Sequence, residues 1–223
     1  MIIYNDKNYV VCKKPVGVSS QITSDERNML SLIGERLGIS KDEIYPIHRL
    51  DATVGGTILY ALNKKSASLL STMMSEHAIK KQYLAIVHGQ ITEESGTFTD
   101  LLFKDSSKNK SFVVKKSRKG VKEASLEYKR LGCVKYNDGF ACLVKVTLHT
   151  GRTHQIRAQF SHRKFPLFGD RRYGSGKDYC SVALWSNEIS FLSPFDKTQK
   201  AYTSLPDINE FPWNLFDESL YVD

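Results

Sequence analysis

The chain has 223 residues, of which 41% are hydrophobic and 25% charged, a composition typical of a globular protein and not of a disordered or fibrous one. Lysine and arginine outnumber aspartate and glutamate by 32 to 24, so the formal net charge of +8 favours a polyanionic partner over a cationic one. No stretch is long and apolar enough for a signal peptide or a membrane span, so we expect a soluble, cytoplasmic protein.

The first third of the chain predicts a strand, a helix and a second strand. Residues 10–12 are a short apolar run before a proline, which favours a strand that ends in a turn. Thr23 and Glu26 have the spacing of a helix capping box, and apolar residues then recur at helical period up to Gly38, where we expect the helix to stop. Residues 56–62 are apolar and predict a buried strand.

The remainder mixes helices and strands without strict alternation, which predicts an α+β fold. Residues 69–74 place leucine and methionine on one helical face, which we interpret as core rather than as a cofactor site. Residues 83–87 predict a strand, and residues 140–148 carry the clearest alternating pattern in the chain. We expect a short helix after the turn at 150–151 and two strands separated by the polar pair 186–187.

Positive charge concentrates in residues 104–130, named here the basic segment. It holds ten basic and three acidic residues, which is nearly the whole net charge of the chain. A solvated loop and hairpin would explain this pattern, but such strong clustering favours contact with a phosphate backbone. The residues that we expect to make this contact are Lys115, Lys116, Arg118 and Lys119.

The four cysteines lie at positions 12, 133, 142 and 180. None belongs to a Cys-x-x-Cys pair, and none has a zinc-type spacing with a histidine. We therefore expect free, mostly buried thiols in a reducing compartment.

Two short segments combine residue types that carry chemistry. The first has His48, Arg49 and Asp51 within four residues, followed by two glycines that allow close approach of a ligand to the backbone. The second, residues 150–157, has two arginines, a histidine and a glutamine at a strand-to-helix corner, where anions can bind. A salt bridge and a capped turn are the plain structural alternative.

The first segment, His48-Arg49-Leu50-Asp51 with Gly56, resembles the His-Arg-Leu-Asp-x-x-Thr-Ser-Gly signature of the RluA family of RNA pseudouridine synthases. Val54 and Gly55 stand where that family usually has Thr and Ser, which puts the local hydrogen bonding of the loop in question. Three further segments resemble other parts of the same family in the expected order: Lys14-Pro15-x-Gly17, residues 81–89 with Tyr83, and residues 150–157 continued by His162, Pro166-Leu167 and Gly169-Asp170. The resemblance extends from about residue 6 to residue 192.

The resemblance implies the pseudouridine synthase fold, a mixed, bent β-sheet with flanking helices and a central catalytic cleft. It implies a single catalytic domain, residues 1–223, without the N-terminal S4-type RNA-binding domain that many relatives carry. The expected activity is isomerisation of a uridine to pseudouridine in a structured RNA, either tRNA or rRNA. This reaction involves no net redox change or hydrolysis, so we expect no metal and no organic cofactor. We expect the chain to act as a monomer.

The resemblance also implies roles for individual residues. Asp51 would be the essential carboxylate, acting either at C1′ of the ribose or through a glycal intermediate. Arg157 would pair with Asp51 and keep it ionised, since a nearby opposite charge favours the charged form of a carboxyl group, and Arg152 is the rival for this role. Tyr83 would lie over the target base, and whether it also moves a proton stays open.

The other motif residues are expected to act on the RNA or on the loop. Arg49 would fill the position that the extruded base leaves in the RNA, and a phosphate contact is the alternative. Arg152 and His154 are expected to contact RNA, whereas His48 and Gly56 are expected to support the loop that carries Asp51.

Two other functions are compatible with parts of the sequence. An inactive RNA-binding protein with the same fold would explain the departures at Val54 and Gly55. A metal-dependent hydrolase could use His48, Asp51 and His154, but the chain lacks a ligand pair such as His-x-x-x-His.

Overall fold

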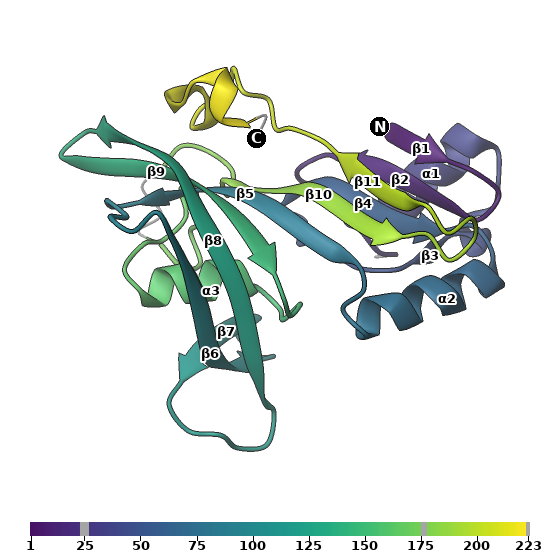
Figure 1. The fold of residues 1–223 in the computed structure, drawn as a ribbon, viewed down its shortest axis with the longest axis horizontal. Helices are drawn as coiled ribbons and strands as arrows, with labels where there is room; N and C mark the ends of the chain where they lie inside the picture. Colours follow the sequence, from purple (N-terminus) through teal and green to yellow (C-terminus); the bar gives the residue numbers. More distant parts are fainter. Residues whose placement is uncertain (23–26, 175–177, 222–223) are drawn as a thin grey trace. The chain divides into compact units, whose positions relative to one another are not determined.

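The computed structural model describes residues 1–22, 27–174 and 178–221, and the chain divides into two compact units. Unit 1 comprises Met1–Lys81 and Trp185–Pro206, and unit 2 comprises Gln82–Leu184 and Asp207–Asp223. Strands and helices follow one another along the chain without regular alternation (Figure 1), so the expected α+β class is confirmed. Among the described residues, no helix is both long and apolar enough to cross a membrane.

Unit 1 contains a mixed sheet around a central strand, β4. The order is β1, β2, β4, β10, with β3 also beside β4 and β11 beside β10. Strand β10 runs parallel to β4, and the other pairs are antiparallel. The strand bounds are Ile2–Asn5 (β1), Tyr9–Lys14 (β2), Tyr45–Pro46 (β3), Gly55–Ala61 (β4), Leu184–Leu192 (β10) and Gln199–Thr203 (β11).

Helices α1 (Met29–Leu37) and α2 (Lys64–Ser75) and a 3₁₀ turn, η1 (Lys41–Glu43), complete unit 1. The Asn28 side chain caps α1 by accepting the backbone N–H groups of Leu30 and Ser31. The helix ends at Gly38, where φ is +70°, so the predicted stop is confirmed. The capping-box pair Thr23 and Glu26 lies outside the described residues.

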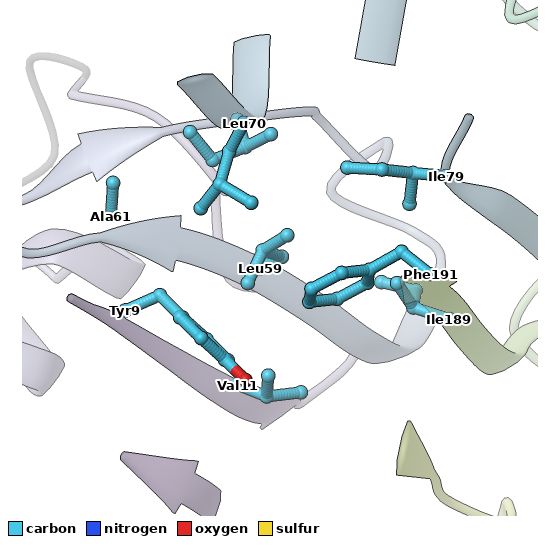
Figure 2. Packing of buried hydrophobic residues seen from close by; sticks show 9 residues of the cluster. Tyr9, Val11, Leu59, Ala61, Leu70, Ile79, Ile189 and Phe191 are labelled. Carbon is cyan, nitrogen blue, oxygen red and sulfur yellow. The ribbon is translucent and has the colours of Figure 1, made fainter. Parts of the chain in front are cut away.

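The core of unit 1 joins the sheet to α2. Figure 2 shows Leu70 of α2 with side chains of three strands, and the cluster comprises Tyr9, Val11, Ile47, Leu59, Ala61, Leu70, Ile79, Ile189 and Phe191. Met73 and Met74 pack against it, which confirms that the methionine stripe is core. Leu69, in contrast, is 38% exposed, so the apolar face of α2 is narrower than predicted.

The described residues of unit 2 form five strands in the order β5, β9, β8, β6, β7. Their bounds are Lys80–His88 (β5), Ser95–Asp105 (β6), Lys110–Val114 (β7), Val121–Tyr136 (β8) and Gly139–Leu148 (β9). Helix α3 (Gln155–His162) contacts β6 and β7 and buries Ile156 and Phe160, as predicted. Two short 3₁₀ turns, η2 (Trp213–Leu215) and η3 (Glu218–Tyr221), lie near the C-terminus and bury Trp213 and Tyr221.

One strand prediction is wrong. The polar pair Ser186 and Asn187 does not separate two strands, because β10 continues through both residues. Ser186 Oγ donates to the carbonyl of Thr57 at 2.8 Å, and Asn187 Nδ2 donates to the carbonyl of Ser204 at 3.1 Å. The polar side chains are therefore satisfied within the sheet, and no turn is needed to expose them.

The expectation that all four cysteines are free thiols is also wrong, because two of them form a disulfide. Cys133 of β8 and Cys142 of β9 are joined by a disulfide, with their Cα atoms 4.1 Å apart. The antiparallel register places these residues opposite each other, and that register cannot be read from the spacing of cysteines. Cys12 and Cys180 are free.

Candidate functional site

Asp51 lies in the loop that joins β3 to β4 in unit 1, and the backbone on both sides of it is fixed. The buried Ser20 hydroxyl donates to the carbonyl of Leu50 at 2.9 Å and accepts the N–H of the same residue at 3.3 Å. The N–H of Val54 donates to the carbonyl of Asp51 at 3.0 Å and closes a turn. The half-buried Asp51 side chain therefore projects from a defined backbone.

Lys14, the last residue of β2, supports the next position of the loop. Its side chain is fully buried, and Nζ donates to the carbonyls of Pro15 (2.9 Å), Val18 (2.6 Å) and Ala52 (3.2 Å). An ammonium has three donors, so these bonds satisfy all of them. Burial lowers the pKa of Lys14 to about 8, and the charge of Asp51 opposes this shift. A buried cation thus contacts the backbone of Ala52, the residue after Asp51.

His48 joins the beginning of the loop to β4. Its Nε2 accepts the backbone N–H of Leu59 at 3.1 Å, so the proton of the neutral ring is assigned to Nδ1. Burial, with a smaller contribution from Lys81, lowers the pKa of His48 to about 3. The neutral ring is thus bonded to β4 through Nε2, and the supporting role of His48 stays a prediction.

The two glycines after the loop lie where β4 meets β10. Gly56 has φ of +118°, and a Cβ there would lie 2.2 Å from the carbonyl oxygen of Ser186. A Cβ at Gly55 would lie 2.3 Å from the Trp185 ring. The serine that the family usually has at position 55 therefore cannot fit beside this tryptophan without movement, which gives a physical reason for that departure.

In unit 2, the segment 150–157 forms a corner fixed to β8. The Gln155 side chain accepts from the Thr150 hydroxyl at 2.8 Å and from the N–H of Arg152 at 3.0 Å, and it donates to the carbonyl of Ser125 at 3.1 Å. His154, immediately before α3, has a left-handed conformation with φ of +53°. This corner fixes the start of α3, and Arg157 is the third residue of that helix.

Arg157 is held by the carboxylate of Asp170, a partner that sequence reasoning did not predict. Its Nε and Nη2 donate to Asp170 Oδ2 and Oδ1 at 2.7 and 2.8 Å, and both side chains are buried. These two parallel bonds fix the plane of the guanidinium in unit 2.

The other predicted residues occupy different environments. Tyr83 is buried in β5, and Arg49 is exposed in unit 1. Arg152 is half-buried, and its Nε donates to the carbonyl of Glu123 at 2.8 Å. The loop between β7 and β8 (Figure 1) carries four exposed cations of the basic segment: Lys115, Lys116, Arg118 and Lys119.

The two units divide the predicted residues between them. His48, Arg49, Asp51 and Gly56 belong to unit 1, whereas the predicted residues from Tyr83 to Arg157 belong to unit 2. The pairing of Asp51 with Arg157 would join the two units and stays a prediction, as does the central cleft. In the described part of the chain, no group of three His, Cys, Asp or Glu side chains could hold a metal ion.

Three residues gain importance only from the structure: Lys14, Ser20 and Asp170. Lys14 and Asp170 stand in segments that the motif comparison covers, but their burial and partners could not be inferred. Nothing in the sequence marks Ser20 as a residue that supports the loop, because its partner Leu50 is 30 residues away.

Comparison with known proteins adds independent information. Residues 8–162 match the family model described as RNA pseudouridylate synthase. The chain is 30% identical to tRNA pseudouridine synthase C of Vibrio parahaemolyticus, with 87% of this chain and 85% of the relative covered. It is also 30% identical to ribosomal large subunit pseudouridine synthase D of Borreliella burgdorferi, where the coverage is 78% and 54%. The structure of human RNA pseudouridylate synthase domain containing 1 matches with a TM-score of 0.76 and 24% identity, covering 93% of this chain and 83% of that chain.

Proposed function

Because this chain belongs to the RNA pseudouridylate synthase family, and is thereby an isomerase that acts on RNA, we propose that Asp51 is its essential carboxylate. The observation that carries this proposal is the loop itself. Ser20 and Lys14 donate to the carbonyls of the residues directly before and after Asp51. The backbone that carries the Asp51 carboxylate is therefore held in one conformation. Such preorganisation is what a catalytic group requires.

The reaction exchanges one glycosidic bond for another. The bond between ribose C1′ and uracil N1 breaks, the base turns, and a bond between C1′ and C5 forms. The C5 proton leaves, N1 becomes protonated, and the atoms balance without oxidant, reductant or water. Asp51 would act at C1′ directly or promote a glycal intermediate, and both routes require the ionised carboxylate.

Positive charge near Asp51 has two proposed sources. Lys14 is in the same unit and already interacts with the Asp51 charge. Arg157 is the proposed second partner, because the family motif carries an arginine at this position and the bidentate contact with Asp170 holds its guanidinium in a defined orientation. Two cations would keep Asp51 anionic after a nucleotide has displaced water from around it.

Recognition of the nucleotide is assigned to four further residues and to the basic segment. Extrusion of a stacked uridine costs a few kcal/mol, and the exposed Arg49 would enter the vacated position. Tyr83 would stack on the base, and Arg152 and His154 would contact the RNA near the corner before α3. The basic segment would hold the phosphate backbone.

The substrate we propose is a tRNA. The match to the relative named for tRNA covers 85% of its length, whereas the match to the relative named for the large ribosomal subunit covers only 54%. Whole-length similarity supports a shared substrate class more strongly than similarity over half a protein.

The test compares wild type with Asp51→Asn on RNA that is labelled with tritium at uracil C5. The tritium is released to water when pseudouridine forms. Small RNA and ribosomal RNA, each from cells that lack the gene, serve as separate substrates. We expect wild type to release tritium from small RNA, and Asp51→Asn to bind that RNA normally without releasing any. The matched control, Asp42→Asn, removes an exposed carboxylate of unit 1 and should retain activity. Activity of Asp51→Asn would overturn the assignment, and release only from ribosomal RNA would overturn the proposed substrate.

A further inference from the structure

A single turn of unit 2, residues 170–174, is wound around the carboxylate that holds Arg157. Besides its two bonds to the guanidinium, Asp170 accepts the backbone N–H groups of Arg172 and Tyr173, each at 3.1 Å. The N–H of Gly174 donates to the carbonyl of Asp170 at 2.7 Å and closes the turn. The orientation of Arg157 therefore depends on the conformation of this turn.

Tyr173 connects that turn to two other elements. Its ring centroid lies 5.2 Å from the Arg157 guanidinium carbon, within the range of a cation–π contact. Its hydroxyl accepts the backbone N–H of Ser111 in β7 at 2.7 Å and lies 3.1 Å from His154 Nδ1. Tyr173 thus contacts the arginine, the residue before α3, and a strand of the basic segment.

The contact with β7 is reinforced on both sides. Arg172 Nη1 donates to the carbonyls of Lys108 and Asn109 at 2.9 and 2.7 Å, and Lys110 Nζ donates to the carbonyl of Arg172 at 2.6 Å. Lys110 Nζ also lies 4.7 Å from the centre of the Tyr173 ring. The basic segment and the turn that holds Arg157 are therefore joined by several direct contacts.

We propose that Tyr173 is a positioning residue, which couples the basic segment to the Arg157 guanidinium so that RNA bound by that segment meets the arginine in one orientation. This inference rests on the proposed role of Arg157. It adds a residue that is not among those proposed above to bind the nucleotide. Tyr173 acts through Arg157 and His154 and needs no contact with the base.

The test uses Tyr173→Phe, which keeps the ring and removes only the hydroxyl. Tyr221→Phe is the matched control, because its buried hydroxyl donates to the carbonyl of Trp213 elsewhere in unit 2. We expect Tyr173→Phe to lower the single-turnover rate of tritium release at saturating RNA about tenfold, as the loss of one well-placed hydrogen bond would. RNA affinity should change less than about twofold, because the cations of the basic segment remain.

Each result decides a different point. A purely structural role would lower the rates of Tyr173→Phe and Tyr221→Phe equally, in step with their unfolding temperatures, and that result would overturn the coupling. A normal single-turnover rate in Tyr173→Phe would overturn it as well. Absence of tritium release by wild type would instead contradict the proposed function, so the two failures are distinguishable.

Discussion

Lys14 shows how one buried charge can determine the geometry of a loop. Its ammonium satisfies three carbonyls, one of them in the residue after Asp51. We expect Lys14→Met to reduce the free energy of unfolding by about 2–4 kcal/mol, because three buried acceptors lose their donor. Lys13→Met is the control: Lys13 is exposed, with Nζ 5.1 Å from the Trp185 ring centre, and should lose less than about 1 kcal/mol. Equal losses in urea denaturation of the two variants would contradict this account.

His48 makes a prediction about acid stability. Its pKa is lowered to about 3 in the folded chain, below the usual 6.5, so between these values the unfolded chain binds a proton that the folded chain does not. The free energy of unfolding therefore falls as the pH drops from about 6.5 towards 3, and above 6.5 this contribution is constant. We expect His48→Gln to remove roughly 1 kcal/mol per pH unit from the slope between pH 6 and pH 4.

The control for this titration is His149→Gln, which changes an exposed histidine that contacts Glu127 in unit 2. Its slope in urea denaturation over the same pH range should stay close to that of wild type. If His48→Gln and wild type lose stability in parallel on acidification, His48 is not buried in its neutral form.

Residue types were predictable from the sequence, but their partners were not. The sequence presents Lys13 and Lys14 as equivalent neighbours, and only the pairing of β2 decides which one is buried. Asp51 and Arg157 stand out because their motifs are local. The bond between Arg157 and Asp170 crosses 13 residues and depends on the turn at 170–174, which no periodicity indicates.

At the scale of elements, the basic segment makes the most direct prediction. The four cations at its exposed loop, Lys115, Lys116, Arg118 and Lys119, contribute to RNA affinity mainly by releasing counterions. Replacing all four with glutamine should weaken binding to every RNA tested. Each lost phosphate contact should flatten the slope of log affinity against log salt by about 0.7–0.9.

A charge-matched variant separates this contact from a general effect of net charge. Lys41, Lys64, Lys65 and Lys80 are exposed in unit 1, and their replacement with glutamine removes the same charge. This variant should keep a salt slope near that of wild type in filter binding from 50 to 200 mM salt. An identical slope for wild type and the basic-segment variant would show that the loop does not contact RNA.

Periodicity predicted two elements well. The alternating pattern of residues 140–148 corresponds to β9, and the helical spacing after residue 28 corresponds to α1. The prediction failed at β10, where Ser186 and Asn187 resemble a turn in the sequence but bond to neighbouring segments of unit 1. Local patterns cannot reveal polar residues whose partners are distant in the chain.

For the whole molecule, the chemistry predicts independence from metal ions. The isomerisation exchanges a C–N bond for a C–C bond and needs no Lewis acid to balance its bonds. We expect EDTA to leave the rate of tritium release within about twofold, with RNA folded in monovalent salt so that loss of Mg²⁺ does not alter the substrate. Loss of activity that zinc or manganese restores would contradict this expectation.

The family could be predicted from the sequence because its motifs occur in order over most of the chain, and the match over residues 8–162 bears this out. The division into two compact units could not be predicted. Two of the boundaries fall after Lys81 and before Trp185, inside β5 and β10, so a strand continues across each of them and the local sequence gives no sign of a change.

The central claim, that Asp51 drives pseudouridine formation in a tRNA, is tested most directly inside the cell. Pseudouridines are mapped in tRNA and rRNA from cells that lack the gene, and from the same cells supplied with either wild type or Asp51→Asn. The account predicts that at least one tRNA pseudouridine disappears with the gene, returns with wild type and stays absent with Asp51→Asn. Restoration of that site by Asp51→Asn, or an unchanged map in cells without the gene, would contradict it.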